Sequence, residues 1–240
     1  MRPALIGAIA SKRLPRYVRT DPYFSSVKSL LHFEGADAST TFTDVKGKTW
    51  TAAGTAQIDT AQYKMQTASG LFGGSGNHID TPDSGDFALG TSDFTIEGWL
   101  YIASGSQYFG GQCAASATNT SVSFLLTVAT TGSFRGYCCS GGSVIGDASV
   151  AGWAASTWAH FAYVRNGTSF TAYRNGVGGT PSAASALSVN DSTNKLAWGR
   201  AGEYTSSGTN THYLDDCRIT VGVARYTANF TPPEYPFPDL

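Results

Sequence analysis

The sequence of 240 residues has 14% charged and 12% aromatic side chains, 28 glycines and a formal net charge of −1. This composition excludes a disordered chain and a strongly basic nucleic-acid-binding protein, and it favours a β-sheet protein with many turns. A chain of this length buries roughly 70% of its unfolded surface, so we expect it to fold without disulfides or a metal.

Basic residues are concentrated at the N-terminus. The first twenty residues contain five basic and no acidic side chains, whereas the rest of the chain contains 11 basic and 17 acidic ones. In residues 1–26 an apolar octet precedes the basic stretch, and this order is the reverse of that in a signal peptide. The octet is also too short to span a bilayer. We therefore expect cytoplasmic synthesis, no membrane span, and a docking arm on an acidic body. The expected arm residues are Arg2, Leu5, Ile6, Arg13, Arg16 and Arg19.

Short strands separated by Gly, Ser, Asn and Asp clusters fill the rest of the chain, which we expect to be a single domain over residues 27–240. The four cysteines lack any CxxC spacing, so we expect them to be buried, reduced thiols. Strands are predicted near positions 27–34, 50, 58, 71–72, 78–79, 121–128, 134–139, 196–199 and 212–220.

The clearest strand is at residues 93–101, where apolar residues alternate with polar and aromatic ones. One face must be buried, and the other carries Glu97 and Trp99. We expect Glu97 to form an ion pair with a basic residue on a neighbouring strand, for example Arg218, and Trp99 to cover that pair.

Two Asn-Gly dipeptides, at 166–167 and 175–176, lie between alternating runs and predict two-residue hairpin turns. The proline-rich segment at 230–238 cannot join a hydrogen-bonded ladder and should lie on the surface. Many short strands and almost no helix predict an all-β fold of two packed antiparallel sheets.

Several stretches, taken together, resemble a known family. They occur in the order found in laminin-G-like, concanavalin A-like lectin jelly-roll domains. The last of them is similar to the form carried by tailed-bacteriophage virion proteins. The stretches are Leu-Leu-His-Phe-Glu-Gly at 30–35, Asp-Phe-Thr-Ile-Glu-Gly-Trp at 93–99, Trp-Ala-His-Phe-Ala-Tyr-Val-Arg-Asn-Gly at 158–167, Tyr-Arg-Asn-Gly-Val at 173–177, Tyr-Leu-Asp-Asp-Cys-Arg-Ile-Thr at 213–220 and Gly-Val-Ala-Arg-Tyr-Thr-Ala-Asn-Phe-Thr-Pro-Pro at 222–233.

The resemblance implies a jelly-roll sandwich and a non-enzymatic structural protein of a bacteriophage virion, either a capsid decoration or a tail or fibre component. Such a protein would dock on other virion proteins through residues 1–26 and display the jelly roll, with host-surface attachment as one use. We expect it to be either a homo-oligomer or bound to a lattice. Specific nucleic-acid binding is not expected, because the body is acidic.

Two other functions remain open. A lectin would place exposed aromatic residues beside polar groups, and the loop candidates are Tyr108, Trp153 and Tyr204. A glycoside hydrolase needs two carboxylates across the scissile bond, but Glu97 has no second acid on its strand face, so this function is less favoured. No cofactor is required. A structural Ca²⁺ is left open, with Asp37 and Asp215 as candidate ligands.

Overall fold

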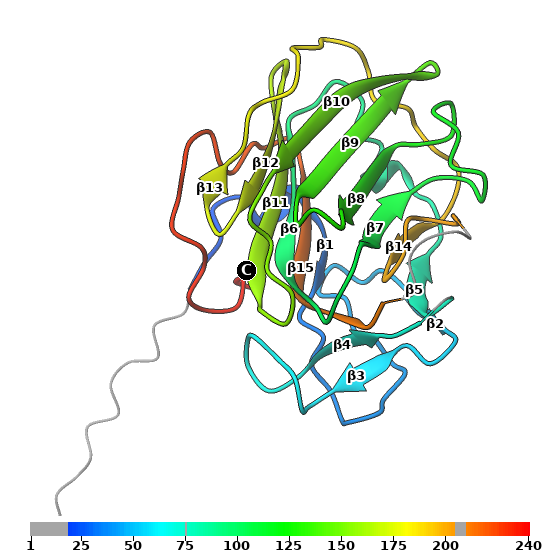
Figure 1. The fold of residues 1–240 in the computed structure, drawn as a ribbon, viewed down its shortest axis with the longest axis vertical. Coiled ribbons are helices and arrows are strands. Elements are labelled where there is room, and N and C mark those ends of the chain that lie inside the picture. Colours follow the sequence, from blue (N-terminus) through cyan, green and yellow to red (C-terminus); the bar gives the residue numbers. More distant parts are fainter. Residues whose placement is uncertain (1–18, 75, 205–209) are drawn as a thin grey trace, which may run out of the picture.

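The computed structural model describes residues 19–240 except residue 75 and residues 205–209. It consists of two antiparallel β-sheets that face each other (Figure 1), which confirms the predicted all-β sandwich. Within the described residues the helical elements are two short 3₁₀ turns, η1 (Phe24–Ser26) and η2 (Gly85–Phe87). None of the described helical segments is long and apolar enough to cross a membrane.

The eight-stranded sheet follows the order β13-β12-β11-β6-β15-β4-β3, and β1 also pairs with β15. Its central strand β6 corresponds to the alternating stretch singled out in the sequence. The strands are β1 (Val27–Leu31), β3 (Gln57–Asp59), β4 (Ser69–Phe72), β6 (Phe94–Ile102), β11 (Ala159–Asn166), β12 (Ser169–Arg174), β13 (Val177–Gly178) and β15 (His212–Val221).

The seven-stranded sheet follows the order β10-β9-β8-β7-β14-β5-β2. Its strands β7 and β10 were not among those predicted from the sequence. The strands are β2 (Thr51–Ala53), β5 (His78–Thr81), β7 (Gln107–Gln112), β8 (Phe124–Val128), β9 (Phe134–Ser140), β10 (Ser143–Val150) and β14 (Leu196–Trp198).

Aromatic side chains from both sheets meet in the core between them. Phe109 of the seven-stranded sheet lies edge to face against Phe161 of the eight-stranded sheet, with ring centroids 4.9 Å apart. Trp198 and Phe134 also pack against the ring of Phe161. All four cysteines are buried and unpaired, as predicted. Burial of large apolar side chains is therefore the main stabilising contribution.

The second Asn-Gly dipeptide forms the predicted turn. Arg174 pairs with Val177, so Asn175 and Gly176 are the two central residues of the β12–β13 hairpin. Both have positive φ, 47° and 77°, which Asn and Gly tolerate better than other residues.

The turn at the first dipeptide begins one residue later than predicted. Asn166 pairs with Ser169 at the end of the β11–β12 ladder, so the central residues are Gly167 and Thr168. Gly167 has a φ of 59°. A turn with glycine first needs positive φ only at that position, and Asn166 can therefore remain in the strand.

Both ends of the described chain cross the outer face of the eight-stranded sheet, which we call the terminal face. Figure 1 shows the first described residues and the C-terminal segment on the same side of the molecule. The backbone N–H of Asp21 donates to the carbonyl of Leu240 at 2.7 Å. Phe237 is buried there against Val27 and Leu30 of β1. This face is thus covered by two segments, residues 19–26 and residues 222–240.

Part of the expected docking arm can be placed. Arg19 donates from Nη1 to the carbonyl of Pro236 at 3.2 Å, and its guanidinium lies 4.9 Å from the ring centroid of Tyr235. Residues 19–26 therefore contact the sandwich itself. The other named arm residues, Arg2, Leu5, Ile6, Arg13 and Arg16, lie outside the described residues.

Candidate ligand-binding site

The outer face of the seven-stranded sheet carries polar and aromatic side chains on β9 and β10. Along β9, Phe134 and Cys138 belong to the core, so the alternating Arg135 and Tyr137 point to the outer face. Asp147 on β10 pairs with Tyr137 in the ladder and is exposed. Strand alternation thus places an arginine, a tyrosine and an aspartate next to one another.

Tyr108 of β7 and Tyr204, from the loop after β14, join this group. The loop passes close to Cys113, directly after β7, because Gly202 has no side chain: a Cβ there would lie 2.4 Å from the backbone nitrogen of Cys113 and 2.8 Å from its carbonyl oxygen. Tyr204 meets Tyr108 edge to face, with ring centroids 5.8 Å apart. The glycine therefore allows a distant loop to bring a second tyrosine onto the sheet.

A small apolar cluster supports these rings from below. Tyr108, Tyr137 and Tyr204 pack against it and stay partly exposed. Burial raises the pKa of Tyr137, and the nearby Tyr108 raises it further, so the Tyr137 hydroxyl keeps its proton at physiological pH. The buried members of the cluster are Cys113, Val122, Leu125, Cys139 and Ala201.

Arg135 and Asp147 form an ion pair with two hydrogen bonds, from Nε to Oδ1 at 2.6 Å and from Nη2 to Oδ2 at 2.8 Å. Their side chains are 42% and 48% exposed, so a ligand can reach both. The guanidinium also lies 4.8 Å from the ring centroid of Tyr137, within cation–π range. We call Tyr108, Arg135, Tyr137, Asp147 and Tyr204 the tyrosine face.

The tyrosine face combines the two kinds of group that a sugar requires. The C–H faces of a sugar ring stack on aromatic rings, while its hydroxyls need hydrogen-bond partners at the ring edge. Tyrosine provides the ring together with a hydroxyl. Arginine only donates and an ionised carboxylate only accepts. The ion pair can therefore both donate hydrogen bonds to sugar hydroxyls and accept hydrogen bonds from them.

Of the three glycan-binding candidates predicted from the sequence, the structure brings Tyr108 and Tyr204 together and places Trp153 elsewhere. Trp153 is only 7% exposed, and its ring lies 6.1 Å from that of Phe134 at the edge of the core. A pocket of about 220 Å³ adjoins it, lined in part by residues 128–132. Trp153 therefore forms no part of the tyrosine face.

Three members of the tyrosine face were not predicted. Arg135 and Tyr137 alternate with apolar residues inside a predicted strand, so an assignment of its two faces could have found them. Asp147 lies on β10, where a register shift between Val144 and Gly146 interrupts the alternation. Without that alternation the sequence has no clear strand signal there.

The terminal face contains a second arginine–carboxylate pair, which is buried. Arg218 of β15 lies opposite Glu97 of β6 and donates to Oε1 at 2.7 Å, which confirms the predicted ion pair. Tyr226 donates to the other carboxylate oxygen at 2.7 Å. Asp21 accepts from Arg218 at 3.0 Å and from Arg225 at 2.7 Å. The residues that cover the sheet thus extend the pair into a network.

Glu97 has no exposed surface. Burial alone would raise its pKa, but Arg218, followed by His160 and Arg225, lowers it to about 2. Trp99 is buried with its ring 5.3 Å from that of His160, whereas the ring that lies over the Arg218 guanidinium, at 3.7 Å, is that of Phe237. An inaccessible carboxylate cannot contact a sugar, so Glu97 holds the sheet to its covering segments.

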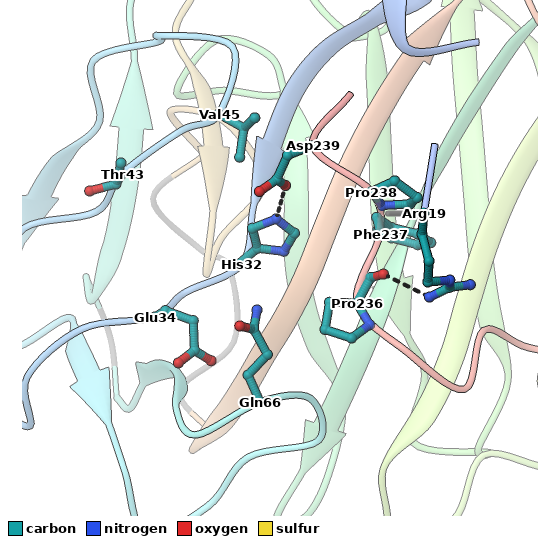
Figure 2. Close-up of a pocket in the computed structure, with 10 residues that line it drawn as sticks. All are labelled: Arg19, His32, Glu34, Thr43, Val45, Gln66, Pro236, Phe237, Pro238 and Asp239. Atoms are coloured by element: carbon teal, nitrogen blue, oxygen red, sulfur yellow. Dashed lines mark hydrogen bonds and ion pairs between the residues drawn. The ribbon is translucent and has the colours of Figure 1, made fainter. Parts of the chain in front are cut away.

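A pocket of about 410 Å³ lies beside β1, under the C-terminal segment (Figure 2). His32 points from its wall to Asp239 at 2.6 Å, and the other ring nitrogen lies 2.5 Å from the buried Asp216. Burial alone would lower the pKa of His32, but Asp216 and Asp239 raise it to about 9. The charged imidazole therefore binds the C-terminal segment to β1. The lining residues are Arg19, His32, Glu34, Thr43, Val45, Gln66, Pro236, Phe237, Pro238 and Asp239.

The two candidate calcium ligands are bound by protein groups. Asp37 accepts a hydrogen bond from the N–H of Thr60, and Asp215 accepts from those of Lys64 and Met65. Burial raises the pKa of Asp215 to about 8, which disfavours the ionised form that Ca²⁺ needs. In the described part of the chain, no group of three or more acidic, histidine or cysteine side chains is placed to hold a metal.

Comparison with known families gives the class of the protein. Residues 72–222 match the family described as the Concanavalin A-like lectin/glucanases superfamily, and the chain belongs to this superfamily. The match confirms the concanavalin A-like, laminin-G-like part of the resemblance seen in the sequence. A comparison with curated protein sequences gave no significant match.

Solved structures with the same fold include binding domains of bacterial toxins. The binding domain of Paraclostridial Mosquitocidal Protein 1 has a TM-score of 0.63 at 14% identity, over 85% of this chain and 50% of that one. The receptor binding domain of the botulinum neurotoxin C/D mosaic serotype scores 0.60 at 10% identity, over 84% and 49%. The botulinum neurotoxin serotype D ligand binding domain in complex with N-acetylneuraminic acid scores 0.58 at 9% identity, over 84% and 49%. The matched region thus spans about half of each structure, and at these identities the likeness is one of fold.

Proposed function

We propose that the chain is a non-enzymatic, glycan-binding component of a bacteriophage particle, and that the glycan binds to the tyrosine face. The observation that carries this function is the grouping of three partly exposed tyrosines with an accessible arginine–aspartate pair. The superfamily includes lectins by name, and similar structures are receptor-binding domains. The buried state of Glu97 supports binding without cleavage.

The similarity of residues 222–233 to tailed-bacteriophage proteins supports a location in the virion. We propose that residues 1–18 dock on other virion proteins, because they combine apolar residues with basic ones and precede Arg19 on the terminal face. The tyrosine face belongs to the other sheet. Docking on the side of the terminal face would leave the tyrosine face free to meet glycans on the host surface.

A glycan array probed with the full chain tests the binding function. We expect specific binding that falls at least tenfold in Tyr108→Ala and Tyr204→Ala, because each truncation removes a stacking ring. Tyr63→Ala is the matched control, since this tyrosine is 46% exposed and lies outside the tyrosine face. Binding that is equally weakened in all three variants, or no binding to any glycan, would refute the proposal.

Deletion of residues 2–18 tests docking. The deletion keeps Arg19 and Asp21, whose contacts close the terminal face, so the sandwich should stay folded by circular dichroism. We expect the shortened protein to be missing from purified phage particles that incorporate the full chain. Normal incorporation would show that docking uses another surface.

A further inference from the structure

We infer that the tyrosine face selects neutral sugars, bound through neighbouring hydroxyl groups, over acidic sugars. This inference rests on the proposed glycan-binding function and concerns the ligand class at the same site. It follows from the position of the Arg135–Asp147 pair among the tyrosines and from the groups that this pair leaves available.

One strand, β8, separates Arg135 from Tyr108, and the side chain between them is small. Thr127 of β8 pairs with Arg135 on one side and with Tyr108 on the other. Its side chain is nearly buried and donates to the carbonyl of Gln107 at 3.0 Å. Two strand spacings separate β7 from β9, about 10 Å. This span suits one sugar ring that stacks near Tyr108 and turns its hydroxyls toward the pair.

The ion pair keeps unused hydrogen-bonding capacity on both partners. Arg135 has five N–H donors, and two of them bind Asp147. The carboxylate has about four lone-pair sites, of which these bonds use two. Both side chains are nearly half exposed. Two neighbouring hydroxyls of a sugar can therefore donate to Asp147 and accept from Arg135 while the pair stays intact.

An acidic sugar would fit this site poorly. The charge of Arg135 is already matched by Asp147, so a ligand carboxylate would have to displace Asp147 or lie beside it. Two like charges at close range repel each other. A neutral sugar carries no such cost.

Matched ligands and variants test the inference. The probes are oligosaccharides that share one core and end either in a neutral hexose or in N-acetylneuraminic acid, measured by calorimetry with the full chain. We expect the neutral member to bind at least tenfold more tightly. Arg135→Gln should weaken it by about tenfold or more, as expected for the loss of a charged hydrogen-bonding group. Asp147→Asn should reduce the difference in affinity between the neutral and the acidic oligosaccharide.

Lys195→Gln is the control variant. It removes an exposed charge that pairs with Asp80 at 3.0 Å on the same sheet, and it should leave both affinities unchanged. Preference for the acidic member, or neutral binding insensitive to Arg135→Gln and Asp147→Asn, would overturn the inference while glycan binding itself stood. Absence of binding to every glycan would overturn the proposed function together with the inference.

Discussion

The terminal face and the tyrosine face each contain an arginine–carboxylate pair that links neighbouring strands. Arg218 and Glu97 are almost completely buried, and Asp21, Arg225 and Tyr226 extend their network. Arg135 and Asp147 have comparable bond lengths but are nearly half exposed. The covering segments therefore determine what each pair does. The covered pair links the chain segments on one sheet, and the uncovered pair on the other sheet remains accessible to a ligand.

The largest expected effect comes from breaking the buried pair. Arg218→Met removes the cation and leaves Glu97 and Asp21 short of a partner inside the protein. We expect a loss of about 3–5 kcal/mol in the free energy of unfolding, measured by urea denaturation. A loss below about 1 kcal/mol would mean that the network contributes little, and the contrast between the two faces would fail.

A pH titration of stability sharpens the account of the terminal face. The pKa of His32 is raised to about 9 in the folded chain from the ordinary value of 6.5. Its contribution should therefore be fully present below pH 6.5 and be lost as the pH rises through 9. We expect the wild type to lose on the order of 1–3 kcal/mol over this range relative to His32→Gln. Parallel stability profiles for the two proteins would contradict this role of His32.

On the tyrosine face, Tyr204→Ala should change binding more than folding. The ring is only partly buried and packs at the edge of a small cluster. Once a glycan has been identified, we expect at least a tenfold loss of affinity by calorimetry. The melting temperature should change little. A large drop in melting temperature with unchanged affinity would assign this tyrosine to the scaffold.

The smallest effect is expected for the exposed pair. Arg135→Met should cost no more than about 1 kcal/mol in unfolding free energy, because solvent already screens both charges. The same denaturation experiment as for Arg218→Met gives a direct comparison. If the two substitutions cost the same, burial would not distinguish the pairs.

Local pattern was enough to predict the sandwich and the contact between Glu97 and Arg218. Alternation identifies which side chains share a strand face, and two long strands with opposite charges favour a cross-strand pair. The cover over that pair was not predictable, because the proline-rich segment ending near Phe237 forms no ladder. Its position depends on tertiary contacts, such as the bond from the Phe237 N–H to Asp216.

The tyrosine face was predictable only in part, for a related reason. Tyr108, Trp153 and Tyr204 look alike in the sequence, since each is an aromatic residue near a turn. Packing separates them: the loop that contains Gly202 brings Tyr204 to Tyr108, whereas Trp153 enters the edge of the core. Contacts between distant segments of this kind carry no local sequence signal.

Nuclear magnetic resonance of the full chain with isotope-labelled tyrosine rings tests the central claim most directly. The protein contains 12 tyrosines, which can be assigned by Tyr→Phe substitution. During titration with a neutral oligosaccharide, we expect the largest shifts at Tyr108, Tyr137 and Tyr204. Shifts confined to Tyr23 and Tyr235, which are exposed on the terminal face, would contradict the account.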